Sequence, residues 1–281
     1  MLTYAAVFKF NKEHDAHTGR FTFRAGQRIP TLTKSKEPGT YTRPHVQEVV
    51  SVKEAIPLIL AGKTVELKHP GKVNSLLKKL HAYAQDAAEK GDAAPNFDAC
   101  RITVKGVSFF CGQHLGLPRI VMPQLGGMPV KGTPADKLPK DADGAVDVGP
   151  EFLDYLKSIG IGFKSKEVKA ESLMASQKEL VGAKVAKRVA KDKYVPSKPV
   201  FTTRDNYIVD GHHAWAGVIG RDADDKHLGD KKLRVIEIDA PISEILHLAN
   251  RWTKKFGLAP KTGDASTTKK MDFVSVFQAP A

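Results

Sequence analysis

The chain is most constrained by residues 207–218, where an apolar run meets a polar turn and then a series of small and apolar residues. The apolar run at 207–209 predicts the end of a buried strand. Asp210 and Gly211 interrupt it, and glycine accepts backbone angles that other residues resist. The residues from His212 onward predict a helix that packs back onto the strand. The stretch therefore predicts a strand, a tight turn at 210–213 and the start of a helix.

The turn at 210–213 has the chemistry of an anion site. The first backbone N–H groups of a helix have no partner within the helix and point toward whatever lies in front of it. The carboxylate of Asp210 and the imidazoles of His212 and His213 add a capacity for metal binding, proton transfer or phosphate binding. A second interpretation is a structural connection in which Asp210 caps the helix and the backbone satisfies one histidine.

The D-G-H-H sequence of this turn resembles the signature turn of the ParB/sulfiredoxin superfamily. The resemblance covers residues 168–257, with flanking matches at 177–185 and 239–242. It implies an α+β protein whose C-terminal domain combines a small mixed sheet with packed helices. It also implies nucleotide binding, because members of the superfamily bind nucleotides at this turn. They include a CTP-dependent DNA-partitioning protein, a sulfinic acid reductase, free-serine kinases and nucleases.

The resemblance also implies roles for individual residues. Gly211, His212 and His213 would offer backbone N–H groups to a phosphate, and one imidazole, that of His213 in preference to that of His212, would add a donor. Asp210 would hold Mg²⁺ together with phosphate oxygens. Glu179 lies where the free-serine kinases carry a catalytic carboxylate, which makes it the candidate base. The catalytic set would then be Glu179, Asp210 and His213. The implied cofactors are a nucleoside triphosphate or diphosphate (ATP, ADP or CTP) and Mg²⁺.

Two positions depart from the family pattern. Sulfiredoxins carry a catalytic cysteine at the position of His212, which excludes reductase chemistry of that type. The arginine that usually follows the second histidine is Ala214 here, and in the family that arginine contacts nucleotide phosphate. Lys184, Arg204 or Lys232 could replace it in cofactor binding, and the sequence does not choose among them.

Charge and composition limit the kinds of partner and the cellular compartment that we expect. A net charge of +13 favours a polyanionic partner such as DNA, although a lysine-rich surface that keeps the protein soluble explains it equally well. Cys100 and Cys111 lack metal-site spacing, so we expect a reduced, structural pair. The sequence shows neither a signal peptide nor the roughly 20 apolar residues that cross a bilayer. We expect a soluble protein without a membrane partner, in the cytoplasm, or in the host cytoplasm or virion if a phage encodes it.

Composition shifts and hydrophobic periodicity divide the chain into five parts. In chain order these are a weakly structured segment (1–48), a small α/β domain (49–125), a linker (126–149), the ParB/sulfiredoxin-like domain (150–260) and a tail (261–281). Residues 15–21, in the first part, resemble short segments of bacteriophage structural proteins.

Apolar stripes and turn residues predict the main elements. The predicted helices cover 72–90, 150–159, a segment from 169 or 172 to 190, and a last segment that starts at 239–241, with Asp239 or Ala240 near its cap and Pro241 in its first turn. The predicted strands include a hairpin around 105–106 and a strand at 233–238.

These features leave four functions open. The first is a nucleotide-binding phosphotransferase with a small hydroxyl substrate, and the second is a ParB-like nuclease, which the positive charge supports. The third is a DNA-binding or switch module that binds a nucleotide without turnover. The fourth is a bacteriophage virion component that contacts other virion proteins and keeps the fold without catalysis. Ala214 and the segment at 15–21 favour the fourth.

Overall fold

The computed structural model describes residues 49–50, 52–67, 74–99, 103–104, 107–108, 115–190, 198–223 and 226–259. The predicted segments 1–48 and 261–281, and both cysteines, lie outside the described residues.

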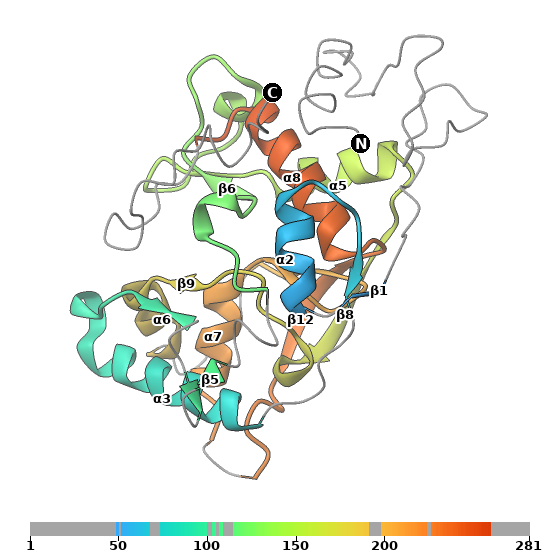
Figure 1. The fold of residues 1–281 in the computed structure, drawn as a ribbon. Coiled ribbons are helices and arrows are strands. Elements are labelled where there is room, and N and C mark those ends of the chain that lie inside the picture. Colours follow the sequence, from blue (N-terminus) through green and yellow to red (C-terminus); the bar gives the residue numbers. More distant parts are fainter. Residues whose placement is uncertain are drawn as a thin grey trace.

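A four-stranded sheet forms the centre of the described structure (Figure 1). Its strands are β8 (Phe163–Lys169), β10 (Val200–Thr203), β11 (Ile208–Asp210) and β12 (Lys232–Ile238). They are ordered β11-β10-β12-β8, with β10 and β12 parallel and the other two pairs antiparallel. The mixture of helices and small sheets confirms the predicted α+β class, and β12 confirms the strand predicted at 233–238.

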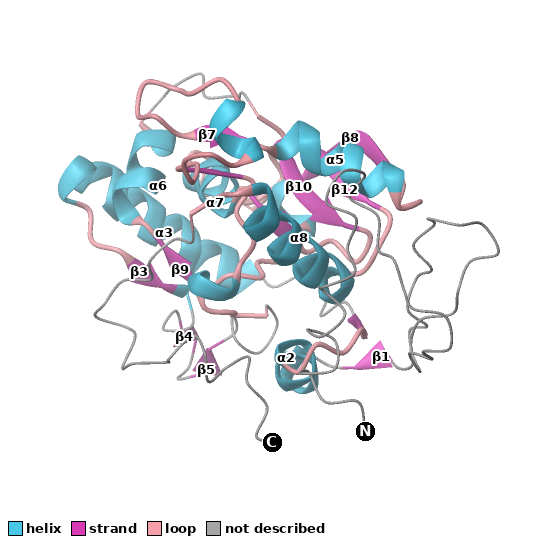
Figure 2. Cartoon of the chain, turned by 90° about the horizontal axis from the view of Figure 1, so that it is seen from above, coloured by secondary structure: helices cyan, strands magenta, loops and turns pink. Residues whose placement is uncertain are grey.

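Helices pack on both faces of this sheet (Figures 1 and 2). The first core contains residues of α2 (Val52–Leu60), α5 (Gly149–Ser158) and α8 (Ile242–Phe256). The second core contains residues of α3 (Asn74–Lys90), α6 (Gly182–Val189) and α7 (His212–Gly220). Successive side chains of a strand point to opposite faces, so β12 contributes Val235 to the second core and Ile238 to the first.

Three of the predicted helices are confirmed where the apolar stripe was long. α3 matches the helix predicted at 72–90, α5 the one at 150–159, and α8 the last one. Each buries its stripe in one of the two cores. Among the described residues, no helix is both long and apolar enough to span a bilayer.

The predicted helix from residue 169 or 172 to 190 is wrong over its first part. The chain there finishes β8, makes a 3-10 turn at Ala170–Ser172 and runs extended into β9 (Glu179–Leu180), and only α6 is helical. Four apolar residues of the predicted stripe, Leu173, Leu180, Val185 and Val189, do share the second core, but the neighbouring residues Leu173 and Met174 point into different cores. This alternation belongs to extended chain.

Short strand pairs join the remaining segments. They are β1 (Val49–Val50) with β2 (Glu66–Leu67), β3 (Phe97–Asp98) with β9, β4 (Thr103–Val104) with β5 (Val107–Ser108), and β6 (Gly126–Gly127) with β7 (Val146–Asp147). The β4–β5 pair confirms the hairpin around 105–106. The pairing of β3 with β9 ties the N-terminal half of the described chain to the segment before α6.

The predicted boundaries at 49–125 and 126–149 do not separate two cores. α2 and α3 complete the cores that the C-terminal elements form. The segment predicted as a linker carries β6, β7 and a 3-10 helix at Pro134–Lys137, and it buries Ala135 and Val148 against Leu258. The described residues of 49–125 therefore share their cores with 150–260.

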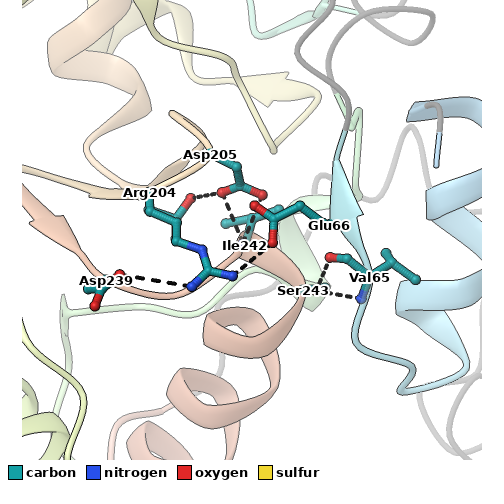
Figure 3. A network of polar contacts seen from close by, with 8 residues as sticks. Val65, Glu66, Arg204, Asp205, Asp239, Ile242 and Ser243 are labelled. Carbon is teal, nitrogen blue, oxygen red and sulfur yellow. Dashed lines mark hydrogen bonds and ion pairs between the residues drawn. The ribbon is translucent and has the colours of Figure 1, made fainter. Parts of the chain in front are cut away.

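The start of α8 is capped by a side chain from the β10–β11 hairpin (Figure 3). The two carboxylate oxygens of Asp205 accept the Ile242 N–H at 3.1 and 3.2 Å. Pro241 is the N-cap residue and has no side-chain cap, and Asp239 and Ala240, predicted near the cap, directly precede it. A residue distant in sequence thus stabilises the end of the helix. Burial raises the pKa of Asp205 to about 6.

We expect Asp205→Asn to change how stability depends on pH. The folded protein holds the Asp205 proton between the ordinary pKa of 3.8 and the raised value of about 6, so the wild type loses stability as the pH rises through this range. Asparagine has no such proton and keeps an oxygen that can accept the Ile242 N–H. Urea unfolding of both proteins at the two ends of this pH range should show that the free energy of unfolding falls less for the variant than for the wild type. Equal falls would contradict the raised pKa of Asp205.

Candidate functional site

The turn at 210–213 has the backbone form that the sequence predicts. β11 ends at Asp210, α7 begins at His212, and Gly211 between them has a φ of 106°. A side chain at Gly211 would be strained by this angle, and its Cβ would lie 3.0 Å from a methyl group of Val200. The N–H of Trp215 bonds to the carbonyl of Gly211 at 3.0 Å, which places the N–H groups of residues 212–214 before the first helical hydrogen bond.

The imidazole of His212 is part of the folded core. Its side chain is buried, and its Nε2 accepts the N–H groups of Ser176 at 3.2 Å and of Gln177 at 3.3 Å. The Ser176 hydroxyl lies 3.1 Å from the same nitrogen. A ring nitrogen that accepts two N–H groups carries a lone pair, so Nε2 cannot donate to a phosphate. The backbone satisfies this histidine, and the imidazole serves the fold and not the predicted cofactor site.

The imidazole of His213 has a different partner from that of His212. Its Nε2 accepts the N–H of Val181 at 3.0 Å. Burial lowers the pKa of His213 well below its ordinary value, and the positive charges of Arg119, Lys184 and Arg188 act in the same direction. The ring is therefore neutral at neutral pH, and its Nε2 lone pair is engaged. This geometry does not fit the predicted role of His213 as a catalytic acid or base.

Three cationic side chains converge on the turn. Burial and the charges of Arg119 and Arg188 lower the pKa of Lys184, while Asp210 raises it. Burial also lowers the pKa of Arg188, again opposed by Asp210. Lys184 and Arg188 lie on α6, and Arg119 begins the 3-10 helix Arg119–Val121. We call Arg119, Lys184 and Arg188 the cationic cluster.

The sequence predicted one member of this cluster. Lys184 was a candidate to replace the arginine that is absent at position 214, while Arg119 and Arg188 were missed. Arg188 follows Lys184 by four residues on one helix, a spacing that places both on the same face and could have identified it. Arg119 lies outside the stretch that resembles the superfamily, and no local pattern marks it.

α6 and α7 approach closely, which brings Arg188 toward the turn. A Cβ at Gly217 of α7 would lie 2.6 Å from the Cβ of Arg188, so a larger residue there would push the helices apart. α6 starts directly after Val181, whose N–H binds His213. The two helices thus run side by side from the turn, and side chains of α6 lean back toward its start.

Asp210 does not form a recognisable metal site. Its Oδ1 accepts the N–H of Gly211 at 2.8 Å, and the positive charges of Lys184 and Arg188 act on its carboxylate. In the described part of the chain, no group of three or more His, Cys, Asp or Glu side chains could hold a metal ion. A cation would meet the cationic cluster at this position, so the residues present do not fit the predicted Mg²⁺ site.

Glu179 lies in β9 and not on a helix. Its Oε2 accepts the backbone N–H of Arg119 at 2.6 Å, and its Oε1 lies 3.6 Å from the Lys178 ammonium nitrogen. Burial raises the pKa of Glu179, while the Arg119 N–H and the Lys178 charge lower it. The carboxylate is therefore near the cationic cluster, but it contacts the backbone of one of its members.

The other two predicted cations lie away from the turn. Arg204 is in the β10–β11 hairpin, at the opposite end of β11 from Gly211, and donates to Glu66 at 2.8 Å (Figure 3). Its other terminal nitrogen lies 3.9 Å from Asp239. Lys232 is exposed at the first position of β12. The structure does not bring the guanidinium of Arg204 to the turn, because it pairs with Glu66 of β2 and lies near Asp239, which precedes α8.

Comparison with known proteins gives no match to a family model, a curated protein or a solved structure. The residues around the turn are therefore the basis for assigning a function.

Proposed function

We propose that the turn at 210–213 binds the phosphate groups of a nucleotide, as in proteins of the ParB/sulfiredoxin superfamily. The observation that carries this proposal is the position of the cationic cluster beside the start of α7. The N–H of Val181, directly before α6, binds His213, a Cβ at Gly217 of α7 would lie 2.6 Å from the Cβ of Arg188, and the Arg119 N–H binds Glu179. The Asp210 carboxylate compensates part of the charge of Lys184 and Arg188, and a bound phosphate would compensate the remaining repulsion within the cluster. The first N–H groups of α7 add donors that favour the same ligand.

Binding without turnover fits the residues better than phosphoryl transfer or phosphodiester cleavage. The Nε2 of His213 accepts the Val181 N–H, and the Glu179 carboxylate accepts the Arg119 N–H. A general base needs a lone pair that can reach a substrate proton. We therefore prefer a nucleotide-binding module to the two catalytic functions, phosphotransferase and nuclease.

A DNA-binding or virion-associated protein without catalysis is the second candidate. The edge strand β8 is exposed over most of its length, and Lys169 at its end lies opposite Lys232 in the β8–β12 register. Lys164 of the same strand is ion-paired with Glu237 at 3.1 Å, so the available positive charge lies at the Lys169 end. With the net charge of +13, this edge offers a surface to a polyanion. Titration with duplex DNA at increasing salt tests the DNA-binding form of this candidate, and no binding at low salt would exclude that form.

Thermal unfolding with ATP, ADP and CTP, each with and without Mg²⁺, tests nucleotide binding. A ligand at a hundredfold its Kd should stabilise the protein by about 2.7 kcal/mol. The double variant Lys184→Gln, Arg188→Gln should lose this stabilisation. Lys187→Gln is the matched control, because Lys187 lies on the same helix, is exposed and pairs with Asp92 at 2.9 Å. Stabilisation by no nucleotide, or equal stabilisation of the double variant, would contradict the proposal.

A further inference from the structure

The position that carries arginine in the resembling proteins cannot present a cation here. Ala214 is buried in the second core, with 6% of its surface exposed. A side chain at this position faces the packed interior between α7 and its neighbours. Any guanidinium that binds a phosphate at the turn must therefore come from another segment.

Arg119 comes from a segment that backbone hydrogen bonds hold in place. The N–H of Leu115 bonds to the carbonyl of Ala175 at 3.1 Å, and the N–H of Leu117 to the carbonyl of Ser176 at 2.7 Å. In the reverse direction, the N–H of Lys178 bonds to the carbonyl of Leu117 at 3.0 Å. The chain that leads into Arg119 is thus paired with residues 175–178.

The same residues also hold the start of α7. The N–H groups of Ser176 and Gln177 bind His212, and the N–H of Val181 binds His213. The segment 175–181 therefore lies between Arg119 and the turn and is bonded to both. Glu179, in the middle of this segment, accepts the Arg119 N–H at 2.6 Å.

Two hydrogen bonds place Arg119 close to His213. The Arg119 N–H binds Glu179, and two residues later the Val181 N–H binds the His213 ring, so the long Arg119 side chain starts within reach of the turn. In agreement with this placement, burial and the charge of Arg119 together lower the pKa of His213 and of Lys184 on α6. A guanidinium fork also binds two phosphate oxygens at once, which an ammonium group cannot do.

We propose that Arg119 supplies the guanidinium that contacts the phosphate at the turn, and that Glu179 is a positioning residue that fixes Arg119 through its backbone. This inference rests on the proposed nucleotide binding and names a residue for it outside the stretch that resembles the superfamily. It also reassigns Glu179 from a candidate base to the support of a ligand-binding side chain.

Calorimetric titration with ATP of the full chain and of Arg119 variants tests the first part. Arg119→Gln should weaken binding about tenfold to hundredfold, which is the effect of losing a charge-assisted hydrogen bond. Arg119→Lys should have an affinity for ATP between those of the wild type and Arg119→Gln, because lysine keeps the charge but lacks the two-pronged guanidinium. Circular dichroism and thermal unfolding without ligand show that each variant folds. Unchanged affinity in Arg119→Gln would overturn the inference.

Variants of Glu179 test the second part. Glu179→Ala should weaken ATP binding and should add no further loss to Arg119→Gln, because both act through one contact. Glu179→Gln should restore binding, since an amide oxygen still accepts the Arg119 N–H. A base would not be rescued in this way. Additive losses in the double variant, or no rescue by glutamine, would overturn the positioning role.

The outcomes separate this inference from the function on which it rests. If the wild type binds no nucleotide, the proposed function fails and the inference fails with it. If the wild type binds, Lys184→Gln with Arg188→Gln abolishes binding, and Arg119→Gln binds as the wild type does, only the role of Arg119 is overturned.

Discussion

Replacing Trp215 by alanine should lower the free energy of unfolding by about 3–5 kcal/mol. Trp215 of α7 is 1% exposed and is among the largest fully buried side chains of the described chain. Its indole nitrogen donates to the carbonyl of Ala170 at 2.9 Å, which fastens α7 to the turn after β8. Alanine would leave a large cavity in the second core and would remove one of the two donors to that carbonyl, which also accepts the Leu173 N–H at 3.2 Å.

Urea unfolding measures this loss of free energy, and two further variants serve as references for its size. Trp215→Phe keeps most of the apolar volume and removes the hydrogen bond, so it should cost less than alanine. Tyr83→Ala removes an aromatic side chain that is 40% exposed and should cost far less still. A loss for Trp215→Ala no larger than that for Tyr83→Ala would show that α7 is not packed as described.

Replacing His212 by leucine should lower the free energy of unfolding by about 2–5 kcal/mol. Leucine is close in size to the imidazole but cannot accept hydrogen bonds, so the N–H groups of Ser176 and Gln177 would remain buried without His212 as an acceptor. His212→Gln, whose side-chain oxygen can accept, should recover part of the loss.

His213→Leu is the matched control for His212→Leu. It removes the acceptor of a single N–H, that of Val181, so its cost should be about 1–3 kcal/mol. The pair of variants also separates fold from function when nucleotide binding is measured on the folded protein. A larger loss of stability for His213→Leu than for His212→Leu would contradict the assignment of His212 to the core.

The sequence predicted well those elements whose signal is local. α3, α5 and α8 each carry an apolar stripe with helical spacing, and β12 alternates between its two faces. The turn at Gly211 was also predictable, because a glycine between an apolar run and a helix start restricts the chain to few conformations.

The segment 173–181 was mispredicted because distant residues fix its conformation. It pairs with residues 115–117, and its N–H groups bind both histidines of the turn. None of these partners is adjacent in sequence, while the apolar residues of the segment imitate a helical stripe. Tertiary hydrogen bonds outweighed the local preference.

The same cause explains what was missed at the candidate site. The resemblance covers residues 168–257 and therefore does not include Arg119. Arg119 lies at the site because residues 115–117 pair with that stretch. The sequence also could not distinguish the two histidines, because it shows two adjacent imidazoles that could each bind a ligand. Their different hydrogen-bond partners are visible only in the structure.

α7 is enclosed by the sheet, by α3 and by α6, and its residues from 214 to 220 are all buried. A helix packed on every side has little conformational freedom to lose. The donors at its first turn are therefore already in place, and binding a ligand there would lose little entropy in ordering them. The amide hydrogens of α7 should accordingly exchange with deuterated water among the last in the molecule, with or without a nucleotide.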